Sequence, residues 1–179
     1  MNFKAGLFGL MTLALLPAGA LAQAADPENT LIITTSGKCD ITIRMRPDLA
    51  PKHVAQIKKL ARSGFYDGTV FHRVIEGFMA QGGDPTGTGM GGSEEPDIKA
   101  EFSQEPFVRG TLGMARAQDP DSANSQFFIM FAEGSFLNGQ YTVWGQVTSG
   151  MDCVDEIAKG EPPAKPDKIV TMKVQKDIQ

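Results

Sequence analysis

One arginine stands in an apolar stretch of the chain, and its side chain is well suited to bind a specific group. The stretch is FHRVIEGFMAQGGD, residues 71–84, in which Arg73 is followed by Phe78, Met79 and Gln81. Arginine is almost never fully buried without a partner, and its planar guanidinium carries rigid hydrogen-bond donors. We therefore expect Arg73 to hold a specific partner, whose identity indicates the function.

A second segment, ANSQFFIM, supplies residue types that complement the first. In an extended strand Gln126, Phe128 and Met130 share one face, so an amide and an aromatic ring project together. Combined with the first segment, they describe an apolar pocket with a few polar donors at its edge, which is typical of a small-group binding site. Neither segment supplies a nucleophile, a general base or a metal site. The combination suits a reaction that breaks no σ bond.

Other common chemistries find little support in the sequence. The two histidines, His53 and His72, have no second ligand at metal-binding spacing, so we expect no metal and no cofactor. His72 alternates with Arg73 and is interpreted as structural, and no G-x-S-x-G nucleophile motif occurs. The glycines at 87, 89 and 92 match a dinucleotide motif, but acidic residues and Pro96 follow where a helix would have to begin.

Strand patterns dominate the elements that must position these residues. Residues 31–35 form a short β-rich run, and residues 39–45 alternate apolar and polar side chains as a half-buried antiparallel strand does. Further strands are predicted in five segments, namely 69–75, 111–115, 127–131, 141–147 and 168–174.

Two helices are predicted beside these strands. Apolar residues recur at helical spacing after Pro51, which indicates an amphipathic helix that stops at Gly64, and residues 151–159 form a shorter helix ended by Gly160. Seven or eight strands without β-α-β alternation predict a mainly β fold, a closed antiparallel β-barrel capped by two α-helices, because closure removes exposed strand edges.

The first residues have the pattern of a secretory signal peptide. Lys4 precedes an apolar run and the small-residue sequence Ala20-Leu21-Ala22, so residues 1–22 are predicted to be cleaved after Ala22. The apolar run is too short for a membrane span, which needs roughly 20 residues. Residues 23–29 are expected to be a disordered lead-in, and residues 30–176 a single domain. The net charge of −4 disfavours a nucleic-acid partner or an anionic membrane surface.

Two cysteines, Cys39 and Cys153, follow the predicted signal peptide. An oxidising compartment permits a disulfide, but their distance in space does not follow from their positions in the sequence. The simpler interpretation is two buried small apolar residues, and both alternatives stay open.

Four segments together resemble the cyclophilin family of peptidyl-prolyl cis-trans isomerases. They are FHRVIEGFMAQGGD, GTLGMARA, SANSQFFIMF and FLNGQYTVWGQV, and the resemblance covers roughly residues 30–174. It implies an eight-stranded antiparallel barrel capped by two helices and a cofactor-independent isomerase. IKAEF and RGTLGMAR resemble bacterial members, and the signal peptide resembles their exported branch, which implies a periplasmic or secreted protein.

The resemblance also assigns site residues. It places the catalytic arginine at Arg73, which would donate a hydrogen bond to the proline nitrogen of the substrate while the X-Pro bond is twisted. On this interpretation the partner of Arg73 lies outside the protein. The implied substrate-binding residues are Phe78, Met79, Gln81, Ala115, Arg116, Gln126, Phe128, Leu137 and Tyr141. The implied partners are proline-containing exported or folding polypeptides, and the protein is expected to be a monomer.

Three positions depart from the best-known members of the family. Phe136 stands where drug-sensitive cyclophilins have tryptophan, Tyr141 where they have histidine, and Arg116 where they often have asparagine. We therefore expect weak cyclosporin binding. Two other functions are considered, a chaperone or docking module that keeps the groove and a barrel that carries a small apolar ligand. The intact Arg73 favours catalysis over the docking module, and the two predicted capping helices and the polar edge of the site disfavour the ligand-carrying barrel.

Overall fold

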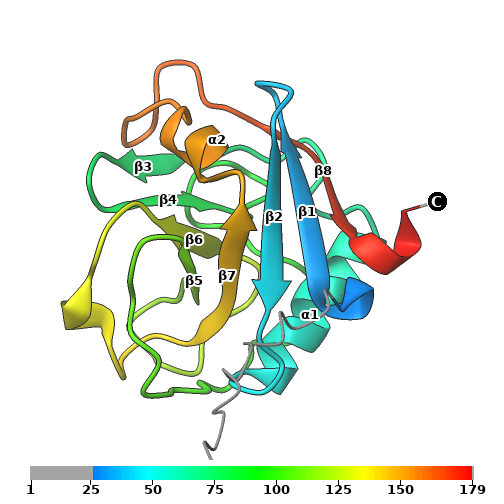
Figure 1. The fold of residues 1–179 in the computed structure, drawn as a ribbon. Coiled ribbons are helices and arrows are strands. Elements are labelled where there is room, and N and C mark those ends of the chain that lie inside the picture. The colour runs from blue at the N-terminus through cyan, green and yellow to red at the C-terminus, as the bar shows by residue number, and fades with distance from the viewer. Residues whose placement is uncertain (1–25, 179) are drawn as a thin grey trace, which may run out of the picture.

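The computed structural model describes residues 26–178, so the predicted signal peptide lies outside the described part. These residues form one eight-stranded sheet with two α-helices (Figure 1). The strands are β1 Thr30–Thr35, β2 Asp40–Met45, β3 Arg73–Ile75, β4 Met79–Gly82, β5 Thr111–Met114, β6 Phe127–Met130, β7 Val143–Ser149 and β8 Ile169–Val174. The helices are α1 Pro51–Arg62 and α2 Met151–Asp155, and the short 3-10 turns are η1 Pro27–Asn29, η2 Ser135–Leu137 and η3 Gln175–Asp177.

The sheet is strongly curled but open, so the predicted closed barrel is wrong. Its strand order is β3-β4-β6-β5-β7-β2-β1-β8, and every neighbouring pair is antiparallel. The two edge strands do not pair with each other, because the irregular segment before β3 occupies the edge of β8. The Gly68 N–H donates to the Ile169 carbonyl at 2.7 Å, and the Phe71 N–H donates to the Asp167 carbonyl at 2.9 Å. This segment fills the gap without continuing the strand ladder.

Strands β4 and β6 are apolar on both faces because each face packs against a different cluster. On one face Ala80 and Ile129 join the main core, which also includes the buried side chains of β1, β2 and α1. On the other face Met79 and Met130 join a smaller cluster with Phe107. A strand that is buried on both faces shows no period-two alternation, which explains the continuous apolar runs in these segments.

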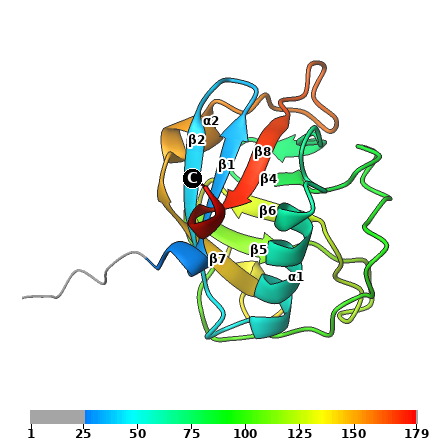
Figure 2. The ribbon, with the colours of Figure 1, turned by 90° about the vertical axis from the view of Figure 1, so that its right-hand side faces the viewer.

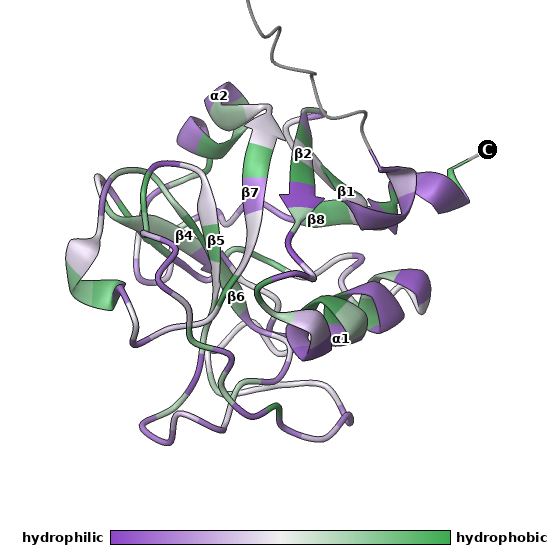
Figure 3. Cartoon of the chain, turned by 60° about the horizontal axis from the view of Figure 1, so that its bottom comes forward, coloured by the Kyte–Doolittle hydropathy of each residue, from purple (hydrophilic) through white to green (hydrophobic). Residues whose placement is uncertain are grey.

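Helix α1 has the predicted amphipathic pattern and is capped by a residue distant in sequence. Its hydrophilic and hydrophobic residues alternate along the ribbon in Figure 3, and Figure 2 shows it against the sheet, where it contacts β8. The Glu101 carboxylate accepts hydrogen bonds from the backbone N–H groups of Lys52 and His53 and contacts His53 Nδ1 at 2.7 Å. Burial lowers the pKa of His53, despite the opposing effect of Glu101. His53 therefore serves the fold.

Helix α2 is shorter than predicted and is tied to the sheet by a disulfide. The helix ends at Asp155, and the N–H of Ala158 donates to the Asp167 carboxylate at 2.9 Å rather than continuing the helical pattern. Cys39 and Cys153 form a disulfide with a Cα to Cα distance of 5.7 Å. The alternative of two separate buried cysteines is therefore wrong, and the bridge links the end of the β1–β2 turn to α2.

The start of the described chain is held by ion pairs. Pro27–Asn29, which the sequence places in a disordered lead-in, form a 3-10 turn capped by the Asp26 carboxylate. The Glu28 carboxylate bonds Lys58 and Arg62 of α1, which explains why this turn is ordered. Neither helix within residues 26–178 is long and apolar enough to span a membrane.

Candidate active site

Strand register brings the two segments singled out in the sequence into one row. Arg73 on β3 lies opposite Gln81 on β4, and Gln81 lies opposite Phe128 on β6. Phe128 in turn lies opposite Gly113 on β5. Residues directly opposite one another in an antiparallel pair project from the same face, so these side chains lie side by side. The guanidinium of Arg73, the amide of Gln81 and the ring of Phe128 therefore lie next to one another on one face of the sheet.

A hollow of about 280 Å³ opens over this row and collects most of the predicted site. Its lining consists of Arg73, Phe78, Met79, Gln81, Ala115, Arg116, Phe128, Phe136, Leu137 and Tyr141. Every predicted site residue except Gln126 is among them. Phe136, which stands where drug-sensitive cyclophilins have tryptophan, also lines the hollow without having been predicted to do so, and it is 63% exposed at the rim. Most lining residues are apolar or aromatic, and the polar exceptions are Arg73, Gln81 and Arg116.

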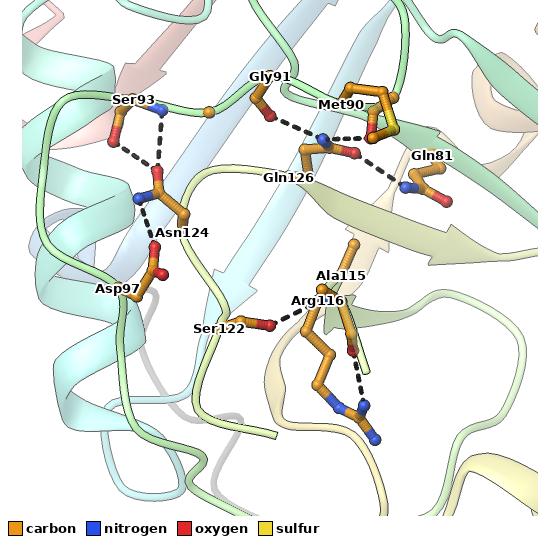
Figure 4. Close-up of a pocket in the computed structure, with 13 residues that line it drawn as sticks. Gln81, Met90, Gly91, Ser93, Asp97, Ala115, Arg116, Ser122, Asn124 and Gln126 are labelled. Carbon is orange, nitrogen blue, oxygen red and sulfur yellow. Dashed lines mark hydrogen bonds between the residues drawn. The ribbon is translucent and has the colours of Figure 1, made fainter. Parts of the chain in front are cut away.

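A second hollow of about 530 Å³ adjoins the first and contains Gln126 (Figure 4). Gln81, Ala115 and Arg116 line both hollows, so together they form one groove. The remaining lining of the second hollow is mostly polar or glycine, and it includes Met90, Ser93, Asp97, Ser122 and Asn124. The groove therefore has an apolar compartment and a polar one.

Two glutamines at the border between these compartments are locked together. Gln126 Nε2 donates to the carbonyls of Gly89 at 3.1 Å and Gly91 at 2.8 Å. Because two carbonyls require the amide nitrogen on that side, Gln126 Oε1 faces Gln81 and accepts from its Nε2 at 3.0 Å (Figure 4). The Gln81 side chain is thus held in one orientation at the edge of the apolar compartment.

Arg73 has a partner within the protein, which corrects the expectation that its partner lies only outside. Its Nε donates to Glu161 Oε2 at 2.7 Å, and its side chain is 42% exposed. The two terminal nitrogens of Arg73 make no hydrogen bond within residues 26–178. Glu161 was missed because it lies far from Arg73 in sequence and belongs to no motif. Both terminal nitrogens of Arg73, with their four N–H groups, consequently remain available at the hollow.

Comparison with known proteins identifies the family. Residues 30–174 match the family described as cyclophilin type peptidyl-prolyl cis-trans isomerase/CLD. The chain therefore belongs to the cyclophilins. The activity of this family is the cis-trans isomerisation of X-Pro peptide bonds, which requires no cofactor.

Relatives and solved structures agree with this assignment. The chain is 53% identical to a probable peptidyl-prolyl cis-trans isomerase of Brucella suis, with both chains covered completely. It is 46% identical to peptidyl-prolyl cis-trans isomerase B of Bacillus subtilis over 68% of this chain and 85% of that protein. The crystal structure of a Hirschia baltica cyclophilin matches with a TM-score of 0.81 at 31% identity, covering 88% of this chain and 77% of that one. A Cryptosporidium parvum cyclophilin type isomerase, determined in the presence of the dipeptide Ala-Pro, matches with a TM-score of 0.74 at 31% identity over 81% and 98% of the two chains.

The aromatic floor of the cyclophilin groove depends on a glycine that the sequence analysis did not select. The Phe128 ring stacks on Phe107 with centroids 5.7 Å apart and meets the edge of Tyr141 at 5.9 Å. A Cβ atom added to Gly113 would lie 2.2 Å from Phe128 Cζ, which is far below a van der Waals contact. Gly113 thus makes the space in which the ring lies. The sequence predicts a strand over residues 111–115, but nothing in its pattern distinguishes Gly113.

Arg116 connects the two loops that border the cyclophilin groove. Its guanidinium lies 4.5 Å from the centroid of the Tyr141 ring. Nη1 donates to the Ala117 carbonyl at 2.9 Å, and Nη2 donates to the Gln140 carbonyl at 3.0 Å. Cation-π contacts of this kind contribute about 0.5–1 kcal/mol at exposed sites. The terminal nitrogens of Arg116 are therefore engaged with the protein, unlike those of Arg73.

A buried carboxylate organises the glycine-rich loop beside the polar compartment. Asp84 is 1% exposed and accepts hydrogen bonds from the N–H groups of Thr86, Gly89 and Gly91. Burial raises the pKa of Asp84, but the hydrogen bonds from Thr86, Gly91 and Gly89 outweigh it and bring the pKa to about 2. The charged carboxylate thus fixes the glycines whose carbonyls orient Gln126. Among the described residues no group of three or more His, Cys, Asp and Glu side chains is placed to hold a metal ion.

Proposed function

We propose that Arg73 accelerates X-Pro rotation by donating a hydrogen bond to the proline nitrogen in the twisted state. Rotation has a barrier of ~18–20 kcal/mol because it breaks amide resonance. As the bond twists, the nitrogen becomes pyramidal and regains a lone pair that the planar amide lacks. A donor aimed at this lone pair stabilises the transition state more than the ground state, so it raises the rate.

The observation that carries this proposal is the difference between the two arginines of the hollow. Both Arg73 and Arg116 line it, but the terminal nitrogens of Arg116 donate to backbone carbonyls. The terminal nitrogens of Arg73 make no such bonds within the described chain, and its Nε is held by Glu161. Arg73 is therefore the arginine equipped to donate to a ligand.

The apolar compartment supplies the second part of the proposed mechanism. Phe78, Met79, Phe128 and Leu137 form the walls that would hold the pyrrolidine ring. Gln81 and Gln126 would hold the neighbouring backbone, and the polar compartment would receive adjacent residues of an extended chain. The dipeptide used with the Cryptosporidium parvum structure supports proline-containing peptides as the substrate class. No proton transfer is required.

Kinetics of a short X-Pro peptide test the role of Arg73. We expect Arg73→Ala to lower kcat/KM by about 10²–10³, which is the typical loss on removing one preorganised donor. Arg73→Lys should recover little, because lysine lacks the planar fork. Arg44, an exposed arginine on β2, provides the control, and Arg44→Ala should match the wild type. If Arg73→Ala is as fast as the wild type, the proposed mechanism is wrong.

The proposed location is the periplasm or the extracellular space, in the exported bacterial branch of the family. The disulfide between Cys39 and Cys153 supports this location, because such bonds persist in oxidising compartments. Residues 1–22 would then be a signal peptide cleaved after Ala22. The test is the N-terminal sequence and mass of the protein from fractionated cells. A full-length chain in the cytoplasm with two reduced cysteines would overturn it.

We further propose that the protein is a monomer and binds cyclosporin weakly. Phe136 lies at the rim of the apolar compartment, where its ring is 5.5 Å from that of Phe78. It offers no indole N–H to a ligand, unlike the tryptophan of drug-sensitive members. Nanomolar affinity in a direct titration would contradict the weak binding, and a sedimentation mass of twice the chain mass would contradict the monomer.

A further inference from the structure

We propose that Glu161 is a positioning residue of this isomerase, which orients the guanidinium of Arg73 by accepting a hydrogen bond from its Nε. The inference rests on the proposed role of Arg73 and adds a residue that neither the family motifs nor the sequence pattern identified. Glu161 lies outside both hollows of the groove, so it would act on the substrate only through Arg73.

Backbone pairing places Glu161 next to Arg73. Val74 and Gly160 form an antiparallel bridge in which each N–H donates to the other carbonyl at 2.8 Å. The residue before Val74 is Arg73 and the residue after Gly160 is Glu161, so the same register sets these two side chains opposite each other. The row of neighbouring side chains across the sheet therefore starts at Glu161. Arg73, Gln81 and Phe128 follow it in that order.

The loop that carries Glu161 is anchored at both ends. At its start Gly160 has a φ of +146°, and an added Cβ would lie 2.6 Å from the Cα of Pro163, so the path of the chain there requires glycine. At its end the Asp167 carboxylate accepts hydrogen bonds from the Ser36 hydroxyl at 2.7 Å and from the Ala158 N–H at 2.9 Å. The position of Glu161 is thus determined by the fold.

The hydrogen bond from Arg73 Nε to Glu161 determines which nitrogens of the guanidinium can donate to a substrate. Because a guanidinium is planar, a partner on Nε limits its rotation and leaves both terminal nitrogens as donors. Nε of Arg73 has this one acceptor at 2.7 Å, and the adjacent Gln81 directs its own amide toward Gln126. The pair is half-exposed, with side-chain exposures of 42% and 52%, so its effect on global stability should be small. Its main consequence is the orientation of the donors toward the twisted bond.

The test compares kcat and KM of Glu161→Ala and Glu161→Gln, measured by NMR exchange at varied X-Pro peptide concentration. We expect Glu161→Ala to lower kcat about fivefold, the equivalent of about 1 kcal/mol at 1.4 kcal/mol per tenfold, while KM stays within about twofold. Glu161→Gln keeps an acceptor oxygen at the same distance from the backbone and should retain more than half of the wild-type kcat. The matched control is Glu76→Ala, which removes an exposed carboxylate from the β3–β4 turn without removing the Arg73 contact.

A second arm separates this inference from the proposed role of Arg73. In an Arg73→Ala background, Glu161→Ala should cause no further loss, because its effect passes through the guanidinium. If Arg73→Ala is slow but Glu161→Ala matches Glu76→Ala, the positioning role is overturned and the proposed function stands. An equal loss from Glu161→Ala with and without Arg73 also overturns the positioning role. If Arg73→Ala itself is as fast as the wild type, the proposed role of Arg73 is wrong, and the positioning role of Glu161 is overturned with it.

Discussion

Gly113→Ala should distort the apolar compartment, although the substitution replaces none of the residues that line it. The added Cβ would lie 2.2 Å from Phe128 Cζ and 2.7 Å from Phe107 Cε1. Carbon atoms in contact are about 3.5–4.0 Å apart, so the Phe128 ring must move by roughly 1.3 Å or more. Phe107 stacks against this ring and is fully buried, which leaves little room for retreat. The ring is therefore pushed toward the hollow that it lines.

The size of the effect follows from this displacement. Overpacking of a core costs about 1–3 kcal/mol, which lowers Tm by about 2–4 °C per kcal/mol in a domain of this size. A misplacement of about 1 Å in an active site can cost about 10²-fold, so we expect kcat/KM to fall by about 10–100-fold. The loss of activity should thus appear well below the melting temperature, in protein that is still folded.

The assay combines thermal unfolding with the kinetics of a short X-Pro peptide at 25 °C. Gly37→Ala provides the control, because a Cβ at this turn position meets its nearest atom, Thr35 Oγ1, at 3.6 Å, an ordinary contact. The reasoning is refuted if Gly113→Ala retains the wild-type kcat/KM, or if Gly37→Ala loses as much activity as Gly113→Ala.

Two further predictions concern stability. Removing the disulfide with Cys39→Ser and Cys153→Ser should lower the free energy of unfolding by up to about 5 kcal/mol, because the bridge closes a loop with a sequence separation of 114. Denaturant titration measures this loss, and kcat/KM at 25 °C should stay within about twofold, since neither cysteine lines the groove. The pKa of Asp84 is lowered from 3.8 to about 2 by its hydrogen bonds, so its stabilising contribution is complete above about pH 4 and is lost as the pH falls toward 2. The difference in unfolding free energy between wild type and Asp84→Asn should accordingly narrow below pH 4, and a difference that is independent of pH would contradict this account.

The sequence predicted those parts of the molecule that local pattern controls. The spacing of apolar residues after Pro51 predicted α1, which ends at Arg62 just before the expected stop. The residues that the family resemblance assigned, apart from Gln126, line the apolar compartment, because the resemblance transfers positions motif by motif. Strand β4 was not predicted as a separate element, because it has only four residues, of which Met79, Ala80 and Gly82 are buried, and it shows no apolar-polar alternation.

The remaining features depend on contacts between distant segments. The open sheet results from residues before β3 bonding to the start of β8, which no local pattern encodes. The contact between Glu161 and Arg73 requires the bridge between Val74 and Gly160, and the disulfide requires α2 to dock near the β1–β2 turn. In each case the decisive quantity is a register or a docking position set by the whole fold.

The most direct test of the central claim separates substrate binding from turnover in Arg73→Ala. Peptide Kd is measured by NMR titration, and turnover at saturating peptide by exchange spectroscopy on the same samples. A hydrogen bond made only to the twisted bond predicts that turnover falls about 10²–10³-fold while Kd changes less than about threefold. If Kd instead rises by that factor while turnover at saturation is preserved, Arg73 serves ordinary substrate binding and the account is contradicted.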